Sequence, residues 1–213
     1  MANPSTIARK DFYDVPGTPT YFIDGGNQQV GGGAASAAQR IFADTVQEVV
    51  DKRLEVKPGA KVMLTGAVHG DKVEVAARVG KAGKPGQKLR LQIALVEELV
   101  RYTGENGVRF HPMVVRSLAS AGKHVLGFPL APGKRVKTAY TFDVAGIAAD
   151  ASVHLDEMEG GSSQRFGKFQ FVERKSDINR DNLRIVGWVQ DEETKEVLQV
   201  AAVDLKPSAA RAR

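Results

Sequence analysis

Residues 73–79 read Val-Glu-Val-Ala-Ala-Arg-Val, and in this stretch apolar side chains alternate with charged or small ones. A period of two is typical of a β-strand that buries one face and exposes the other. Val62 and Leu64 alternate in the same way just before it, and residues 69–72 (His-Gly-Asp-Lys) lie between the two stretches. Two alternating stretches around a short polar turn predict a β-hairpin.

The same alternation continues along most of the chain. Further strands are predicted by Leu89, Leu91, Ile93 and Leu95, by Val108, Phe110 and Val114, by Val136, Thr138, Tyr140, Phe142 and Val144, and by Leu183–Gln190 with Val197–Val203. The connections are too short for crossover helices, so a sandwich is favoured over a parallel sheet. We expect residues 56–205 to form this antiparallel, immunoglobulin-like β-sandwich. For residues 151–175 the pattern fits either a helix or a strand. The tail, residues 206–213, is expected to be flexible.

The composition excludes several classes of protein. The 213 residues carry a formal net charge of +5, from 30 basic and 25 acidic residues that are interleaved along the chain. A nucleic-acid-binding protein usually concentrates its basic residues on one face, so no nucleic-acid partner is expected. The densest basic stretch, residues 80–88, is rich in glycine and lacks an aromatic residue for base stacking, which favours a solvated loop over a phosphate-binding loop.

Membrane insertion and thiol chemistry are not expected of this chain. No stretch approaches the roughly 20 apolar residues of a membrane helix, and the N-terminus lacks the pattern of a signal peptide. The chain contains no cysteine. Disulfides, thiolate nucleophiles and cysteine-ligated metals are therefore excluded, and no cofactor is expected.

A helix is predicted over residues 32–54. Its apolar stripe consists of Ile41, Phe42, Thr45, Val46, Val49 and Val50, with charged residues on the opposite face. Ser36 followed by Gln39 predicts a capping box at its start. Residues 57–59 (Lys-Pro-Gly) end the helix, which places a domain boundary near residues 54–60.

The stretch Val15–Gly25, Val-Pro-Gly-Thr-Pro-Thr-Tyr-Phe-Ile-Asp-Gly, resembles the part of thioredoxin-fold proteins in which a cis-proline loop leads into an inner strand. A short strand around residues 28–31 and the helix over residues 34–53 fit the same pattern. The resemblance implies a partial thioredoxin-like unit over residues 1–55, made of a helix, a cis-Pro strand, a short strand and a helix.

The resemblance also implies a site. In that family the backbone beside the cis-proline pairs with an extended peptide, so Gly17, Thr18 and Pro19 are the candidate peptide-binding residues and the Thr18–Pro19 bond is expected to be cis. The alternative is an ordinary Pro/Gly loop before a strand. The family's Cys-x-x-Cys motif and first strand would lie upstream of residue 1, so this chain has only part of the pattern.

Residues 91–98, 106–116 and 188–199 resemble the sandwich that follows a thioredoxin domain in some bacterial exported and outer-membrane-associated proteins. The resemblance implies an α+β chain in which the thioredoxin-like unit precedes the sandwich. It also implies that the parent protein is periplasmic or associated with the outer membrane.

Four residues form a candidate polar cluster in the predicted sandwich. Glu97, Arg109, His111 and Arg116 lie on two strands that we expect to be neighbours, where they form either a buried ion-pair network or a binding site. The four histidines of the chain lack the spacing that places two on one helix face, so no metal site is expected.

The sequence therefore predicts a non-catalytic binding or assembly module of an exported thioredoxin-like protein, with a protein or peptide as its partner. The alternative is the inactive C-terminal part of a thiol-disulfide oxidoreductase whose Cys-x-x-Cys lies upstream. The apolar residues Tyr21, Phe22, Ile23, Ile41 and Phe42 exceed what a half fold can cover, so a homo-oligomer is expected.

We predict that this chain does not reduce disulfides, because a thiolate is the nucleophile of that reaction and no residue here supplies one. The measurement is an insulin-reduction assay with dithiothreitol as the electron donor. A rate above that of dithiothreitol alone would contradict the prediction.

Overall fold

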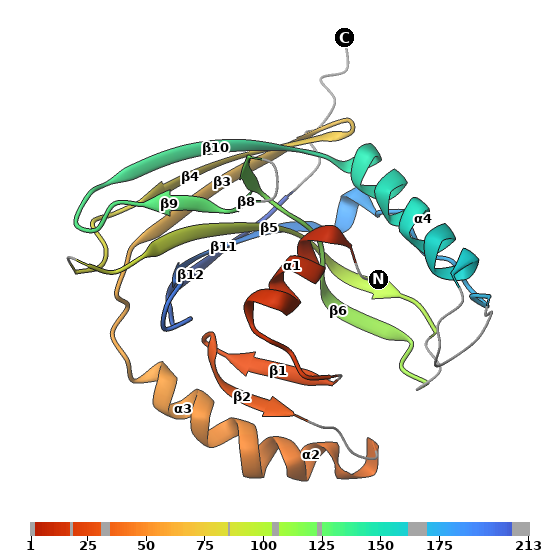
Figure 1. The fold of residues 1–213 in the computed structure, drawn as a ribbon, viewed down its shortest axis with the longest axis horizontal. Helices are drawn as coiled ribbons and strands as arrows, with labels where there is room; N and C mark the ends of the chain where they lie inside the picture. The colour runs from red at the N-terminus through yellow and green to blue at the C-terminus, as the bar shows by residue number, and fades with distance from the viewer. Residues whose placement is uncertain are drawn as a thin grey trace.

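The predicted hairpin supplies two strands of a three-stranded antiparallel sheet (Figure 1). In the computed structural model, β3 (Val62–His69) pairs with β4 (Lys72–Val79), and β4 pairs on its other side with β10 (Val136–Asp143). The structure describes residues 3–17, 19–30, 35–84, 86–103, 107–122, 125–161 and 170–205.

A second antiparallel sheet has five strands. Its order is β12 (Val197–Asp204), β11 (Leu183–Asp191), β5 (Leu89–Arg101) and β6 (Phe110–Leu118), and β9 (Phe128–Leu130) pairs with the first residues of β5 beside β6. β7 (Ser120–Gly122) and β8 (Val125–Leu126) form a small separate ladder. The long strands lie where the alternation predicts them, whereas β7, β8 and β9 were not predicted.

The two sheets pack face to face around one hydrophobic core. Alternate residues of β4 and β5 supply much of it, namely Val73, Val75, Ala77, Val79, Leu89, Leu91, Ile93 and Leu95. Phe142 of β10 and Ile185 of β11 are fully buried in the same core. The chain is thus α+β with open antiparallel sheets, and the immunoglobulin-like connectivity stays a prediction.

The N-terminal segment covers the outer face of the five-stranded sheet (Figure 1). It consists of α1 (Pro4–Phe12), β1 (Thr20–Ile23), β2 (Gly26–Val30) and a helical stretch, η1 (Ala35–Ala37), α2 (Ala38–Ile41), the π-helix η2 (Phe42–Gln47) and α3 (Glu48–Leu54). A helix, two strands and a helix follow one another as expected. The thioredoxin-like assignment itself stays a prediction, and the Thr18–Pro19 bond lies outside the described residues.

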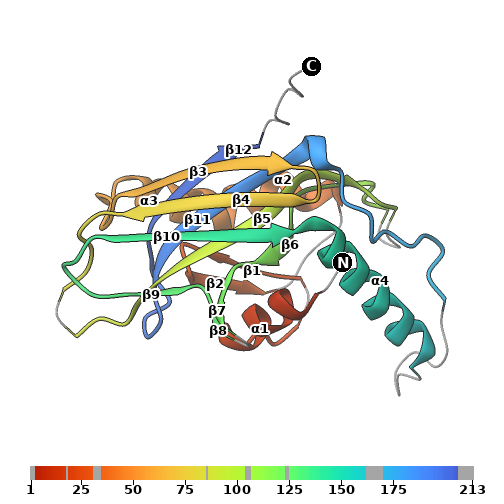
Figure 2. The ribbon, with the colours of Figure 1, turned by 90° about the horizontal axis from the view of Figure 1, so that it is seen from above.

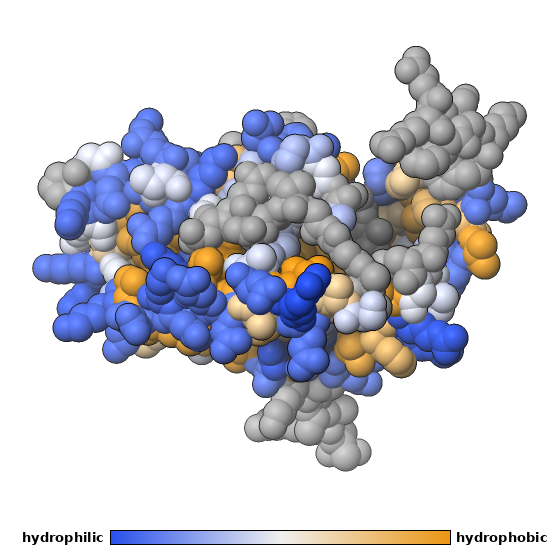
Figure 3. Space-filling model, turned by 90° about the horizontal axis from the view of Figure 1, so that it is seen from below, coloured by the Kyte–Doolittle hydropathy of each residue, from blue (hydrophilic) through white to orange (hydrophobic). Residues whose placement is uncertain are grey.

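The predicted capping box at Ser36 and Gln39 is wrong. The N-cap of α2 is Ala37, which makes no side-chain cap, because a 3₁₀ turn occupies residues 35–37. A capping box is present instead at α1, where Asn3 and Thr6 satisfy each other's backbone amides. The wider turn of η2 changes which residues share a face, and Phe42 is 53% exposed. Figure 3 views the molecule from the side of α2 and α3, with apolar residues visible among hydrophilic ones.

The strand prediction at Val144 is also wrong, because α4 (Val144–Gly160) begins there. Asp143 caps this helix by accepting a hydrogen bond from the Gly146 N–H at 3.2 Å, and Gly161 follows as its C-cap. The open segment 151–175 is therefore helical up to residue 160. Residues 170–175 form neither helix nor strand, and residues 162–169 lie outside the described part.

No helix in the described part of the chain is long and apolar enough to cross a membrane.

The tip of the β1–β2 hairpin joins the N-terminal segment to the sandwich. Arg53 at the end of α3 donates to Asp24 at 2.8 Å and to Glu196 in the β11–β12 turn at 3.1 Å. The Val197 N–H donates to the Asp24 carbonyl at 2.9 Å. Gly25 has a φ of +78°, and a Cβ there would lie 1.7 Å from the Lys195 carbonyl oxygen. Only glycine fits this contact.

We predict that Gly25→Ala destabilises the protein by about 1–3 kcal/mol from backbone strain alone, with the clash against Lys195 adding to the loss. The matched control is Gly26→Ala, since a Cβ at Gly26 meets no atom within 4 Å. Urea denaturation measures both. Equal midpoints for the two variants would show that the hairpin tip does not hold the two parts together.

Candidate functional site

The four residues of the predicted polar cluster separate into different environments. Glu97 and Arg116 form an ion pair at 2.9 Å, with side chains only 4% and 5% exposed. The ring nitrogen Nε2 of His111 lies 2.9 Å from the Tyr102 carbonyl oxygen, and Arg109 is exposed. A bulge between Leu95 and Val96 sets the register of β5 against β6, and this register was not visible in the sequence.

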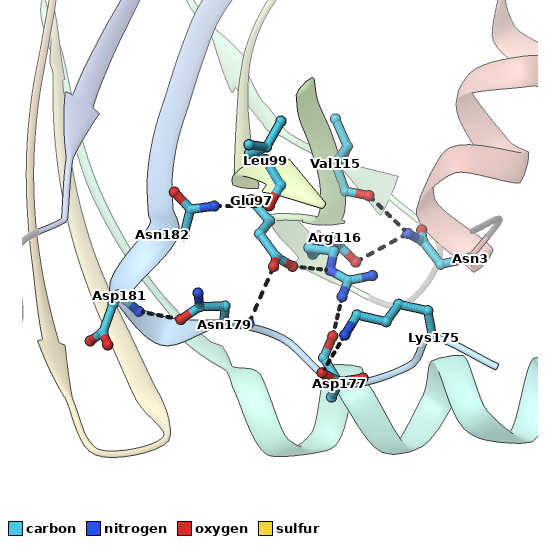
Figure 4. A network of polar contacts seen from close by, with 10 residues as sticks. All are labelled: Asn3, Glu97, Leu99, Val115, Arg116, Lys175, Asp177, Asn179, Asp181 and Asn182. Carbon is cyan, nitrogen blue, oxygen red and sulfur yellow. Dashed lines mark hydrogen bonds and ion pairs between the residues drawn. The ribbon is translucent and has the colours of Figure 1, made fainter. Parts of the chain in front are cut away.

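The ion pair is the centre of a polar network (Figure 4). Glu97 also accepts a hydrogen bond from the Asn179 N–H at 3.3 Å, and Arg116 donates to the Asp177 carbonyl oxygen. The Asn3 side chain donates to the Arg116 carbonyl oxygen at 3.1 Å. The pair thereby ties the start of α1 and the segment before β11 to the β5–β6 ladder.

This network is suited to holding the fold together. Both charges are compensated and hydrogen-bonded, which is the condition under which a buried ion pair is tolerated. The adjoining cavity, lined by Arg116, Ile147, Leu155, Phe171 and Ile178 among others, encloses only about 40 Å³. A cavity of that size holds a water molecule or two, whereas ligand pockets span about 300–1,000 Å³. Of the two interpretations left open by the sequence, the structure favours the ion-pair network.

A larger hollow lies between the N-terminal segment and the outer face of the five-stranded sheet. This α1 groove has a volume of about 530 Å³. Its walls and floor are Thr6, Arg9 and Tyr13 of α1 and its C-cap, Thr20, Tyr21 and Phe22 of β1, Asp24 and Gly25 of the hairpin tip, and Val115, Leu118, Val186, Trp188, Val197 and Val200 of the sheet. Four aromatic side chains and several valines make it mostly apolar.

Gln190 holds the wall of the α1 groove against the sheet. Its side chain is 1% exposed, donates to the Tyr13 hydroxyl at 2.6 Å and to the Lys195 carbonyl at 2.7 Å, and accepts from Arg9 at 2.7 Å. The Tyr13 ring stacks on Phe22 with the centroids 4.4 Å apart. The groove is therefore preformed by packing and hydrogen bonds.

Arg9 supplies the positive charge of the groove. Its guanidinium lies over the rings of Tyr13 and Trp188, at 4.8 and 5.8 Å from the centroids, and burial lowers the pKa of Arg9 from its ordinary value. No carboxylate of the described residues lies within ion-pair distance of it. Asp24, the carboxylate among the groove residues, is engaged by Arg53. Arg9 thus has hydrogen-bonding and ring contacts, and Glu192 acts on it only from beyond ion-pair distance.

The predicted peptide-binding residues lie just before the groove. Gly17 is half-buried, its carbonyl accepts a hydrogen bond from the Thr20 hydroxyl at 2.6 Å, and Pro19 is exposed. Neither lines the groove, whereas the next three residues, 20–22, do. Thr18 lies outside the described residues.

The residues that sequence reasoning missed are Arg9, Tyr13 and Trp188. The signal was present as two cations and two aromatics within residues 9–13 and a single tryptophan in the chain. What the sequence lacked was any sign that residues 9–13 pack against Trp188 on the outer face of the five-stranded sheet. In the part of the chain that the structure describes, no group of three or more histidine or acidic residues could hold a metal ion.

No protein-family model matches the sequence, and a comparison with curated proteins found no match. Among solved structures, a domain of the outer membrane lipoprotein Omp28 from Porphyromonas gingivalis is 16% identical, with 72% of this chain and 93% of that one covered and a TM-score of 0.37. The Pseudomonas fluorescens alkylpurine DNA glycosylase AlkC is 14% identical (80% and 37% covered, TM-score 0.30), and a β-glucosidase from Kluyveromyces marxianus is 8% identical (70% and 14% covered, TM-score 0.33). All three TM-scores lie below 0.5, so none of these likenesses establishes a shared fold or function.

We predict that Arg116→Met costs about 3–5 kcal/mol of stability, because it leaves the Glu97 carboxylate buried without a counter-charge. The double variant Glu97→Leu/Arg116→Met recovers most of that loss. Chemical denaturation measures both, and Arg109→Met, at an exposed position close by, is the control, with a change within about 0.5 kcal/mol. A small loss of stability in Arg116→Met, or a larger loss in the double variant than in the single one, would contradict a structural role for the pair.

Proposed function

We propose that this chain is a non-catalytic protein-binding module that holds an extended peptide segment in the α1 groove, within an exported thioredoxin-like parent protein. One observation supports the proposal above the others. A preformed apolar groove of about 530 Å³ contains a partly buried arginine with no carboxylate of the described residues within ion-pair distance. Such a combination of apolar walls and a few polar groups is typical of ligand sites.

A strand edge beside the groove favours an extended ligand. Among the described elements, β1 pairs only with β2, so one edge of β1 has no strand partner. β12 pairs only with β11, but its Val197 N–H already donates to Asp24 and its Leu198 carbonyl accepts from Gly59. Val197 and Val200 of β12 and residues 20–22 of β1 line the groove. A peptide strand can add to the edge of β1 by backbone hydrogen bonds while its alternate side chains enter the apolar floor.

Arg9 favours a ligand that carries a carboxylate. A guanidinium in a partly desolvated site gains from a carboxylate that it can reach in a two-pronged arrangement. The Gln190 and ring contacts hold the Arg9 side chain in place, so little side-chain entropy is lost on binding. The proposed ligand is therefore an extended apolar segment with an acidic side chain or a free C-terminus.

The rest of the expected function concerns the parent protein. A periplasmic or outer-membrane-associated location and a homo-oligomer stay part of the proposal. The alternative, the inactive C-terminal part of a thiol-disulfide oxidoreductase, depends on a Cys-x-x-Cys encoded upstream, which no observation on these residues favours over the binding module.

Trp188 is the sole tryptophan and lines the groove, so its fluorescence reports occupancy directly. The probe is a short peptide of alternating valine and threonine with a central phenylalanine, made with a free C-terminal carboxylate and as the amide. We predict a saturable change in Trp188 emission, with the carboxylate form bound about tenfold more tightly because it meets Arg9.

Arg9→Gln removes this preference for the carboxylate, whereas Arg40→Gln, on the exposed face of α2, leaves it unchanged. Equal denaturation midpoints of the two variants exclude loss of the fold as the cause. Unchanged Trp188 emission with both peptides would overturn the groove as a binding site, and equal affinities for both peptides in the native chain would overturn the role of Arg9.

A further inference from the structure

Five basic residues gather at one end of the three-stranded sheet. Lys61, Arg78, Lys81, Arg135 and Lys137 are all exposed and line one open hollow of about 510 Å³. They come from the start of β3, the end of β4, the loop after it, and the start of β10. This basic end lies on the outer face of the sheet, which Figure 2 views from above and which no described element covers.

The basic end is held in place by its backbone. Gly80 N–H donates to the Lys61 carbonyl at 2.8 Å, which fixes the start of β3 against the end of β4. Gly133 N–H donates to the Ala82 carbonyl at 2.8 Å, which joins the loops that carry Lys81 and Arg135. The convergence of the five cations is therefore a property of the ladder and its loops.

The charge pattern across the strands is unfavourable without an external anion. Arg78 and Lys137 lie directly opposite each other in the β4–β10 register, and like charges in that position repel. None of the five cations has a carboxylate within ion-pair distance among the described residues. At the other end of the same face, Lys72 opposes Asp143 at 2.7 Å, and that hydrogen bond lowers the pKa of Asp143. The sheet thus pairs its charges at one end and leaves five unpaired at the other.

The residues of this face limit the kind of anion. Between the basic end and the Lys72–Asp143 pair, the outward residues are the exposed Glu74 and small or polar residues such as Thr65, Ala76 and Ala139. No described residue that lines the basic end carries an aromatic ring on which a base could stack. Met63, 47% exposed, is the neighbour of Arg78 on β3 and adds an apolar side chain among the cations.

We propose that the basic end binds a surface of anionic phospholipid headgroups. An exposed array of Lys and Arg meets several phosphates at once on such a surface, and each cation strengthens partitioning by about fivefold. Phosphate oxygens suit both the two-pronged guanidinium of Arg78 and the point charge of a lysine. Met63 lies where it reaches the apolar region just beneath the headgroups.

The test is co-sedimentation of the full chain with vesicles of phosphatidylglycerol and phosphatidylcholine in equal parts, against vesicles of phosphatidylcholine alone. Binding is expected only to the anionic vesicles and is expected to weaken steeply with added salt. Arg78→Glu/Lys137→Glu is expected to reduce the partition coefficient by about tenfold or more. Lys10→Glu/Arg40→Glu makes the same change in net charge elsewhere and is expected to have a much smaller effect.

Three outcomes would overturn the proposal. The first is equal loss of binding in the two double variants, which would mean attraction by net charge alone. The second is release by inorganic phosphate at constant ionic strength, which would indicate a site for a free phosphate. The third is tighter binding to a duplex DNA than to the vesicles, which would indicate a nucleic-acid surface. Co-sedimentation tests the basic end, whereas Trp188 emission in the peptide titration tests the α1 groove. Either proposal can therefore be overturned without affecting the other.

Discussion

The strand β5 is buried on both faces, and most of the architecture follows from that constraint. Residues 91–97 are all buried, although alternate side chains of a strand point to opposite sides. Leu91, Ile93 and Leu95 face the core between the sheets, while Ala94 and Val96 belong to a second cluster on the other side. A single sheet facing water on that side would expose this second cluster, so the N-terminal segment is needed as a third layer.

Covering a second face brings polar groups out of water, and the structure pairs several of them there, although the buried Oε1 of Gln92 accepts no hydrogen bond. Glu97 meets Arg116, and Gln190 meets Arg9, Tyr13 and Lys195. Both sets join the start of the chain to strands far along it. A buried polar group without a partner costs about 1–3 kcal/mol, so these contacts make the docking of α1 specific as well as stable. The same contacts that dock α1 also form the wall of the α1 groove.

The sequence could predict the parts of this fold that depend on short-range patterns. The β3–β4 hairpin, the start of β5 and the β11–β12 pair follow from alternation over a few residues and from the turns between them. The start of α4 escaped prediction because Val144 continues the alternation of β10, and only the Asp143 cap marks the change. Of the predicted polar cluster, Glu97 and Arg116 form an ion pair, whereas His111 lies beside the Tyr102 carbonyl and Arg109 is exposed. A one-residue bulge decides which side chains face each other, and alternation carries no information about bulges.

Long-range placement is what the sequence could not supply. The α1 groove exists because residues 9–13, 20–22 and 186–188 converge, and no local period relates segments so far apart. The basic end, likewise, combines residues from β3, β4 and β10 that are interleaved with acids along the chain. Basic and acidic residues that alternate along the sequence are therefore not evenly distributed over the surface of the folded chain. The α1 groove and the basic end lie on the outer faces of two sheets that pack face to face, which are opposite sides of the sandwich. A chain resting on an anionic surface by its basic end would consequently present the α1 groove away from that surface, where an extended segment of another protein can reach it.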